Sequence, residues 1–520
     1  MSVAITLLAV AVCLAGQLHL LLHAFQQEHY ENARLYLWVR RDLPERLGLR
    51  FALVALLGAV GEWLTVGAAG VLGAALFFAF ATWSRDQVKP LVFTARARRL
   101  FAVALLIALV PPVLAGLLLG PVAAAVAGAL CVLGLAWLLS LANVVLRPYQ
   151  RLETRRYVRS ARRKLEQVRP LVVGISGSFG KTTTKACVAA ALDPHGPAYP
   201  TPASFNSYLG VVRAINEGLE PRHETFVAEL GSYRIGDIAE LCELVEPTVG
   251  ILTNLGPAHL ERFGSMDAIE QAEGEVADAL PEDGLFVTRA DDERCRRVAS
   301  DRARCRTLLF SPAPHEAADL WAESIAVASG GTDFEIRWRD DPEPLAVRSR
   351  LLGEPNVANL LAAAAVARDR GSTPAQIARA LRRVAPPKHR LEPIVNQAAG
   401  IVVIDDSYNS NPIGAAAALG VLAAHEAGRR ILVTPGMVEL GPQEEEENRR
   451  LGELAAAVCD ICLLAGPLAP HIRAGLVGAG FDEGGIIVAA DGPAAHAELA
   501  KLSRRGDVIL FENDLPDVYG

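Results

Sequence analysis

Residues Gly174–Lys185 read GISGSFGKTTTK, a glycine-rich turn that ends in Gly-Lys-Thr. An apolar run precedes the turn and an alanine-rich run follows it, which predicts a strand, a turn and a helix that opens at Lys181. Backbone N–H groups in such a turn and at a helix N-terminus point towards bound phosphate. The Lys181 ammonium would reach the β- and γ-phosphates of a nucleotide, and the Thr182 hydroxyl would bind Mg²⁺. The predicted phosphate contacts are Gly177, Ser178, Gly180, Lys181, Thr182 and Thr183.

This turn departs from the strict pattern of a phosphate-binding loop, G-x-x-x-x-G-K-[ST]. The pattern requires glycine at position 175, where this chain has Ile175, and the glycine lies at Gly177 instead. A structural loop without a ligand is the alternative interpretation. The flanking strand and helix favour a nucleotide site.

Seven further motifs follow the loop in a fixed order. They are SFNSYLGV (204–211), VAELGSYRIGDI (227–238), TNLGPAHLERFGS (253–265), GEPNVANLLAAAA (353–365), HRLE (389–392), VIDDSYNSNP (403–412) and GMVELG (436–441). With this series, residues 170 to about 511 resemble the Mur ligases, the ATP-dependent enzymes that build the peptide stem of peptidoglycan. Within that family the motifs are most similar to those of the ligase that adds D-alanyl-D-alanine.

The resemblance implies a carboxylate–amine ligation driven by ATP through an acyl phosphate, with Lys181 among the catalytic residues. It also implies that Glu229 and His259 bind the Mg²⁺ that bridges the γ-phosphate and the substrate. The family usually carries a lysine, carbamylated by CO₂, at the position where this chain has Glu273. We interpret Glu273 as a replacement for the carbamate, and a solvent-facing helical glutamate is the alternative. The expected catalytic and metal-binding set is therefore Lys181, Thr182, Glu229, His259 and Glu273.

The remaining site residues are also implied by the resemblance. Asn356 is expected to contact adenine, and Arg390 and Asp406 are expected to close onto the nucleotide with the C-terminal domain. Closure of such a lid would exclude water from the acyl phosphate. The expected substrate contacts are Asn206, Ser207, Asn409 and Asn411.

Hydrophobic residues make up 51% of the 520 residues and are concentrated before residue 147. A membrane-spanning helix needs about 20 apolar residues. The expected spans are 3–25, 50–66, 67–83, 100–119 and 121–146. Arginines and lysines gather in the loops 26–50 and 84–99, which predicts that these loops are cytoplasmic. The N-terminus would then lie outside, and the catalytic domains would lie at the cytoplasmic face of the inner membrane.

The segment 147–169 is strongly basic and is expected to form a linker helix against anionic lipid headgroups. The net charge of −7 gives no indication of nucleic-acid binding. Eight scattered cysteines argue against a disulfide framework, and the pair Cys459 and Cys462 lies in an apolar run typical of a buried strand. The oligomeric state is left open.

The expected fold is a membrane α-helical N-terminal domain followed by two α/β domains. Residues 170–385 would form the P-loop central domain, and residues 386–520 a smaller doubly wound domain with strands at 401–404, 431–434, 459–465 and 507–511. A capped helical pattern at 371–385 ends at Pro386-Pro387, which predicts a hinge between them.

The function expected from these observations is an ATP-dependent amide ligase that acts at the membrane on a cell-envelope carboxylate, with a lipid-linked carboxylate as one form of that substrate. Membrane spans stand where the family holds its UDP-sugar, and the C-terminal Glu512-Asn513-Asp514 replaces a basic stretch, which favours a cationic or neutral amine. The alternatives are a membrane-anchored D-alanyl-D-alanine-adding ligase, a poly-γ-glutamate-type ligase, and a P-loop protein that uses nucleotide only as a switch.

Overall fold

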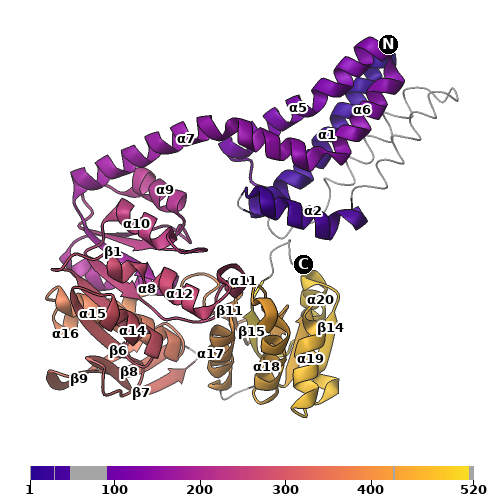
Figure 1. Cartoon of the computed structure of the whole chain (residues 1–520). Coiled ribbons are helices and arrows are strands. Elements are labelled where there is room, and N and C mark those ends of the chain that lie inside the picture. The colour runs from indigo at the N-terminus through magenta and orange to yellow at the C-terminus, as the bar shows by residue number, and fades with distance from the viewer. Residues whose placement is uncertain (1, 29, 47–90, 329, 426–427, 515–520) are drawn as a thin grey trace. The chain divides into compact units, whose positions relative to one another are not determined.

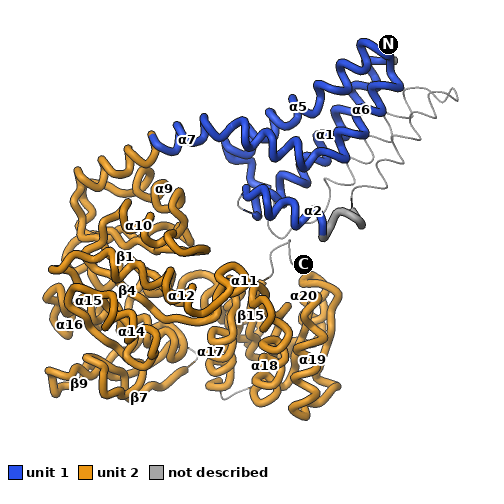
Figure 2. The backbone as a smooth tube through the Cα atoms, in the orientation of Figure 1, with its two compact units in different colours: residues 1–155, 516–519 blue, residues 156–515, 520 orange. Residues whose placement is uncertain are grey.

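The computed structural model describes residues 2–28, 30–46, 91–328, 330–425 and 428–514. These residues fall into two compact units that divide at Arg155 (Figure 2). The first unit is helical, and the second unit holds both α/β domains (Figure 1).

Apolar helices pack against one another in the first unit. They are α1 (Ser2–Gln27), α2 (Asn32–Arg46), α5 (Ala95–Leu119), α6 (Pro121–Leu133) and the beginning of α7 (Leu135–Val168). Their shared core includes Leu14, Leu22, Leu100 and Leu139, all fully buried. Within the described residues, α1 and α5 are long and apolar enough to cross a membrane, and α6 with α7 adds a third span if that bent pair is counted as one.

Two of the sequence predictions for this unit can be compared with the structure. The predicted span 121–146 is interrupted, because α6 and α7 meet at Gly134 with a bend of 73°. Glycine is a weak helix former, so a break is easily accommodated there. The predicted linker helix 147–169 is helical, but it continues α7 without a break at residue 146. The predicted spans 50–66 and 67–83 lie outside the described residues.

A nine-stranded sheet forms the centre of the P-loop domain, in the order β2-β3-β1-β4-β5-β6-β7-β8-β9. Strands β2 to β7 pair in parallel along this order, and β8 and β9 are antiparallel. The strands are β1 (Leu171–Ser176), β2 (Ala198–Pro200), β3 (Thr225–Glu229), β4 (Val249–Leu252), β5 (Leu285–Arg289), β6 (Arg306–Ser311), β7 (Leu320–Ala328), β8 (Gly331–Trp338) and β9 (Asp341–Ser349).

Helices cover both faces of this sheet, as expected for a parallel α/β sheet. One core lies under α8 (Lys181–Leu192), α15 (Glu354–Asp369) and α16 (Pro374–Arg383). The other core lies under α9 (Tyr208–Gly218), α10 (Asp237–Val245), α12 (Met266–Glu273), α13 (Glu275–Asp278) and α14 (Glu293–Asp301), and it includes Ala161 from the second half of α7. Thr373 and Gln376 form a capping box at the start of α16, which confirms the predicted capped helix.

The C-terminal domain is a six-stranded sheet in the order β10-β11-β15-β12-β13-β14. Its strands are β10 (Glu392–Asn396), β11 (Ile401–Asp406), β12 (Arg430–Thr434), β13 (Ile461–Ala465), β14 (Ile486–Ala489) and β15 (Val508–Glu512), and its helices are α17 (Pro412–Ala423), α18 (Glu444–Ala456), α19 (Ala469–Gly478) and α20 (Gly492–Leu502). The four predicted strands are confirmed, and β10 and β14 were missed. Both missed strands lie at sheet edges and leave residues such as Val395 and Val488 exposed, so their apolar pattern is weak.

Candidate active site

The glycine-rich turn connects β1 to α8 and requires its glycines for geometric reasons. Gly177 has φ +126°, and a side chain there would lie 2.1 Å from the Thr253 hydroxyl oxygen. Gly180 has φ +82° and forms the N-cap of α8. Ile175 is fully buried as a strand residue of β1, so the turn begins two residues later than in the strict pattern. This placement explains why the glycine is displaced.

Glu273 supports the turn from inside the protein. Its carboxylate accepts hydrogen bonds from the Gly177 backbone N–H at 2.7 Å and from the Ser232 hydroxyl at 2.8 Å. Its backbone carbonyl accepts one from the Ser176 hydroxyl at 2.8 Å. The side chain is almost fully buried, so the solvent-facing alternative is wrong.

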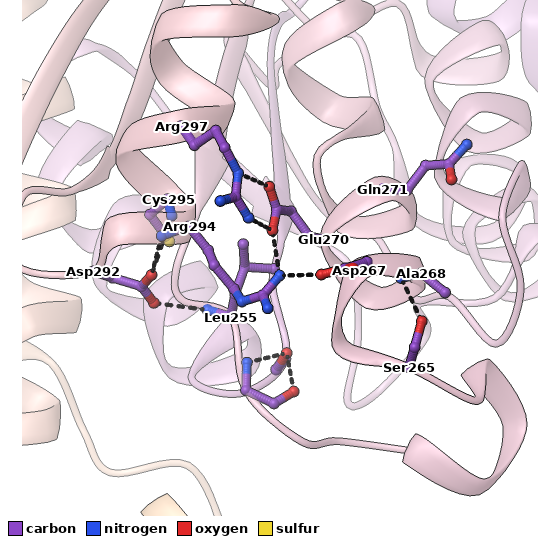
Figure 3. A network of polar contacts seen from close by, with 12 residues as sticks. Leu255, Ser265, Asp267, Ala268, Glu270, Gln271, Asp292, Arg294, Cys295 and Arg297 are labelled. Atoms are coloured by element: carbon purple, nitrogen blue, oxygen red, sulfur yellow. Dashed lines mark hydrogen bonds and ion pairs between the residues drawn. The ribbon is translucent and has the colours of Figure 1, made fainter.

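Ion pairs hold the helix that ends at Glu273, as Figure 3 shows. Glu270 of α12 accepts hydrogen bonds from Arg294 at 2.6 Å and from Arg297 at 2.7 Å, both on α14. Asp267, one turn earlier, also accepts from Arg294, at 2.8 Å. These contacts fix α12 against α14, and therefore fix the position of Glu273 below the turn.

Three of the predicted residues come together at the carboxyl end of β3. The Thr182 hydroxyl donates to Glu229 Oε1 at 3.2 Å, and Asn206 Nδ2 donates to the same oxygen at 3.1 Å. Lys185 Nζ contacts Glu229 Oε2 at 2.8 Å, and both of these side chains are buried. Lys185 was missed, although it lies one helical turn after the predicted Lys181. The Lys181 ammonium donates to the Gly177 carbonyl of its own turn.

The Thr182 hydroxyl and the Glu229 carboxylate fit Mg²⁺, which binds few protein oxygens and keeps water and phosphate oxygens as its other ligands. When bound there, the ion would neutralise charge on a transferring phosphoryl group. Across the described ranges, no three His, Cys, Asp or Glu side chains lie close enough to hold a metal ion. The structure therefore does not bring His259 and Glu273 into one metal group with Glu229.

His259 instead faces the C-terminal domain. It is the N-cap residue of α11 (Leu260–Phe263) with φ +52°, and its Nδ1 contacts the Glu439 carboxylate. The Glu261 backbone N–H donates to the Glu439 carbonyl at 3.2 Å. Glu439 was missed, although it lies in the recognised GMVELG motif. This contact joins the central domain to the loop after β12.

The predicted adenine contact, Asn356, is buried and bonded within the protein. Its Nδ2 donates to the Leu352 carbonyl at 2.8 Å, and its Oδ1 accepts from Asn359 at 3.1 Å. Asn359 in turn accepts from the Thr184 hydroxyl of α8 at 2.9 Å. The two asparagines thus support the P-loop helix, and the adenine contact of Asn356 stays a prediction.

Two of the predicted substrate residues cap helices. The Ser207 hydroxyl accepts from the Gly210 N–H at the start of α9, and Asn411 accepts from the Gly414 N–H at the start of α17. Asn409 is exposed. Of the other predicted phosphate contacts, Ser178 donates its hydroxyl to the Gly256 carbonyl at 3.0 Å and its backbone N–H to the Asn254 carbonyl at 3.1 Å, and Thr183 is buried.

Residues of the predicted nucleotide-closing set lie at the carboxyl end of β11. The Arg390 guanidinium lies 4.0 Å from the ring centre of Tyr408. The Tyr408 hydroxyl donates to the Ser204 hydroxyl of the central domain at 2.6 Å, a second contact between the two domains. Asp406 Oδ1 accepts from the Leu391 N–H at 3.0 Å, and burial raises the pKa of Asp406 to about 6.

Glu512 ends β15 directly beside Asp406 in the sheet. Its Oε1 accepts from the Ser410 hydroxyl at 2.5 Å, and its Oε2 has no hydrogen-bond partner in the part of the chain that the structure describes. Burial raises the pKa of Glu512 well above its usual value, and the nearby Asp406 raises it further. Because Glu512 is buried, it does not present its carboxylate at the surface, contrary to the expected acidic lining of an amine site.

This combination of a P-loop with a second α/β domain in contact with it defines a nucleotide-dependent enzyme of two catalytic domains. Residues 175–367 match the Mur ligase middle domain, and residues 389–512 match the Mur ligase, glutamate ligase domain. The chain belongs to the Mur ligase family and is an ATP-dependent carboxylate–amine ligase, which confirms the resemblance drawn from the motifs.

Similar proteins support this assignment. The UDP-N-acetylmuramoyl-tripeptide–D-alanyl-D-alanine ligase of Mycobacterium tuberculosis is 36% identical over 369 residues, which cover 66% of this chain and 70% of the relative. The Escherichia coli ligase of the same name is 35% identical over 56% of this chain and 63% of the relative. The solved MurF ligase of Thermotoga maritima, in complex with ADP, matches with TM-score 0.61 and 28% identity, covering 69% of this chain and 79% of that chain.

Proposed function

We propose that this chain forms an amide bond on a peptidoglycan precursor at the cytoplasmic face of the membrane. The relatives named above are ligases that add D-alanyl-D-alanine to a UDP-linked tripeptide. The observation that carries the proposal is the convergence of Thr182 and Asn206 on the Glu229 carboxylate beside the glycine-rich turn. This arrangement suits positioning and charge neutralisation around a γ-phosphate.

In the proposed reaction, a carboxylate oxygen of the precursor attacks the γ-phosphorus of ATP, and the bond to the β-phosphate oxygen breaks to release ADP. The amine nitrogen then attacks the acyl carbon, loses a proton, and displaces inorganic phosphate. The N–H groups at the start of α8 and the Lys181 ammonium would stabilise the charge on the transferred phosphoryl group. The contacts of Glu439 and Tyr408 with the central domain would help to exclude water from the acyl phosphate.

Membrane attachment is supported by the helical unit. Neither matched family domain includes residues before 175, and the described part of that stretch holds two helices able to span a membrane. Helix α7 leaves this unit and ends three residues before β1 begins. A catalytic domain linked so closely to apolar helices would meet a precursor at the membrane surface, and a lipid-linked carboxylate would fit that placement.

The chemistry can be tested on the full chain in detergent. We expect ATP-dependent hydroxamate when hydroxylamine replaces the amine, because hydroxylamine captures an acyl phosphate. UDP-N-acetylmuramoyl-tripeptide is the first carboxylate to test, and D-alanyl-D-alanine is the first amine. Lys181→Ala should abolish the product. ATP hydrolysis without any hydroxamate, over a panel that includes poly-γ-glutamate and lipid-linked precursors, would favour the switch.

The location can be tested separately by fractionation and protease protection. The chain should remain with membranes after alkaline washing, and its catalytic domains should be cleaved only in inside-out vesicles. Release by alkaline washing would contradict the proposed anchor while leaving the ligase chemistry intact.

A further inference from the structure

Polar atoms without hydrogen-bond partners gather in the first unit where the first turn of α5 meets α7. Within the described residues, Arg96 Nε on α5 and Ser140 Oγ, Asn143 Oδ1 and Gln150 Nε2 on α7 are buried and make no hydrogen bond. Ser140 and Asn143 are each only 4% exposed. Because a buried polar atom without a partner destabilises a fold, four of them in one region indicate a place for a polar ligand.

Tyr30, in the connection between α1 and α2, brings the two helices together. The guanidinium carbon of Arg96 lies 4.1 Å from the centre of the Tyr30 ring, and Asn143 Nδ2 donates to the Tyr30 carbonyl at 3.3 Å. Three residues further along α5, Arg99 donates to Glu153 of α7 at 2.6 Å. All five residues belong to the first compact unit (Figure 2). The start of α5 therefore lies against Tyr30 and against the part of α7 that follows Asn143.

The polar residues of α7 lie along one face of the helix. Ser140, Asn143 and Gln150 follow one another after three and seven residues, which is one turn and then two turns. Gln150 also lies one turn before Glu153, the residue that contacts the first turn of α5. The side-chain amide of Gln150 and the guanidinium of Arg96 therefore belong to facing segments, and each has an N–H group to donate.

The positive charge of Arg96 is not neutralised by a carboxylate among the described residues. The nearby carboxylates are paired with other arginines, Glu153 with Arg99 at 2.6 Å and Glu28 with Arg34 at 3.3 Å. Arg96 itself is only partly buried, so the end of its guanidinium stays accessible. It lies in the first turn of α5, and a helix N-terminus also favours an anion. A guanidinium in this setting suits the oxygens of a phosphate group.

Exposed apolar side chains flank this polar cluster. Val92 and Phe93 directly precede α5, and Val144 and Val145 directly follow Asn143 on α7. A phospholipid carries its phosphate next to acyl chains, so it can contact both kinds of surface at once. A soluble phosphate ester would leave the apolar side chains uncovered. Anionic phospholipids also attract basic residues at the cytoplasmic surface of a membrane.

We propose that Arg96 and Gln150 bind the phosphate of an anionic phospholipid at the cytoplasmic end of the helical unit. Ser140 Oγ and Asn143 Oδ1 would accept hydrogen bonds from headgroup hydroxyls, such as those of phosphatidylglycerol. This inference rests on the proposed membrane attachment. It assigns the helical unit a lipid-selective site in addition to its role as an anchor.

The test uses the full chain in detergent and native mass spectrometry, which detects lipids that stay bound to the protein. The site variant is Arg96→Gln, and Gln150→Leu is a second variant of the same site. The matched control is Arg98→Gln, which removes the same charge from an exposed arginine of the same helix. The probes are phosphatidylglycerol, phosphatidylcholine and sn-glycerol 3-phosphate. The melting temperature without added lipid checks that each variant is folded, and Gln150→Leu decides if Arg96→Gln is not.

We expect the wild type and Arg98→Gln to prefer phosphatidylglycerol to phosphatidylcholine, and each site variant to bind phosphatidylglycerol about tenfold more weakly than the wild type. Equal losses in the site variants and the control would overturn the proposal, because the basic surface as a whole would then account for binding. Equal retention of the two lipids would also overturn it. Binding of sn-glycerol 3-phosphate as tightly as phosphatidylglycerol would replace the lipid with a soluble phosphate ester. Because these measurements are made in detergent, a failure of membrane attachment would be seen separately in the alkaline wash.

Discussion

The carboxylate of Glu273 accepts a hydrogen bond from the backbone N–H of Gly177 at 2.7 Å, across 96 positions of the chain. It is therefore a support of the glycine-rich turn itself. The second oxygen of the same carboxylate is taken by the Ser232 hydroxyl at 2.8 Å. An ionised carboxylate accepts both bonds, and such charge-assisted bonds contribute about 1.5–3 kcal/mol each.

Glu273→Gln should weaken the binding of ATP. The amide has one accepting oxygen, so either the Gly177 N–H or the Ser232 hydroxyl loses its partner. We expect the KM for ATP to rise about tenfold, a loss of about 1.4 kcal/mol, in steady-state ligation assays. Gln271→Ala, in the exposed part of α12, should change the KM little. Full activity of Glu273→Gln would contradict this role.

The wild-type enzyme should also work without CO₂. If Glu273 supplies by itself the negative charge that a carbamylated lysine supplies elsewhere in the family, then removal of bicarbonate should not change the ligation rate. The measurement is the rate in CO₂-depleted buffer with and without added bicarbonate. A rate that recovers on addition of bicarbonate would show that a carbamate is needed at another position.

Lys185→Met should destabilise the central domain. Lys185 and Glu229 form a buried ion pair at 2.8 Å, and removal of one partner leaves an unpaired buried charge, which costs about 3–5 kcal/mol. Thermal unfolding of the full chain in detergent is the measurement. Lys181→Met is the matched control. Lys181 lies one turn earlier and donates to the Gly177 carbonyl of its own turn, so its removal should abolish activity with little change in thermal stability.

The sequence predicted the residues at strand ends better than the contacts between domains. Gly177 follows a buried strand, Thr182 lies in the first turn of a helix, and Glu229 ends a buried strand. Local sequence patterns indicate such positions. The pair His259 and Glu439 is formed by two loops 180 residues apart, so no local pattern could indicate it.

Burial also decided several roles that residue type alone could not. Asn356 and Asn411 have the chemistry of ligand contacts, yet the first donates to the Leu352 carbonyl just before α15 and the second caps α17. Glu512 looks like an exposed acidic end in the sequence, but β15 lies between β11 and β12 and carries it into the interior. The break at Gly134 was missed because the apolar run continues on both sides of it.

His259 and Glu439 should act as a coupled pair. Each side chain is the other's partner across the contact between the two catalytic domains, so either substitution to alanine breaks the same interaction. We expect each single variant to lower kcat/KM, and the double variant to lower it by less than the product of the two effects. The coupling expected from a double-mutant cycle is about 0.5–3 kcal/mol. Fully multiplicative effects would show that the two residues act independently.

Glu512 should make the stability of the protein depend on pH. Its folded pKa is raised, and that of Asp406 is raised to about 6, so the folded state binds more protons than the unfolded chain does above the usual carboxyl pKa of about 4. Stability from these groups is therefore present at low pH and is lost as the pH rises through the folded pKa values.

Glu512→Gln keeps the shape of the side chain, leaves an acceptor for the Ser410 hydroxyl, and removes one of the two titrating groups. Its melting temperature in detergent should exceed that of the wild type by a few degrees at pH 8 and converge with it near pH 5. Glu446→Gln, on the exposed side of α18, should follow the wild type at every pH. A constant difference between Glu512→Gln and the wild type from pH 5 to pH 8 would mean that Glu512 does not change its charge over this range.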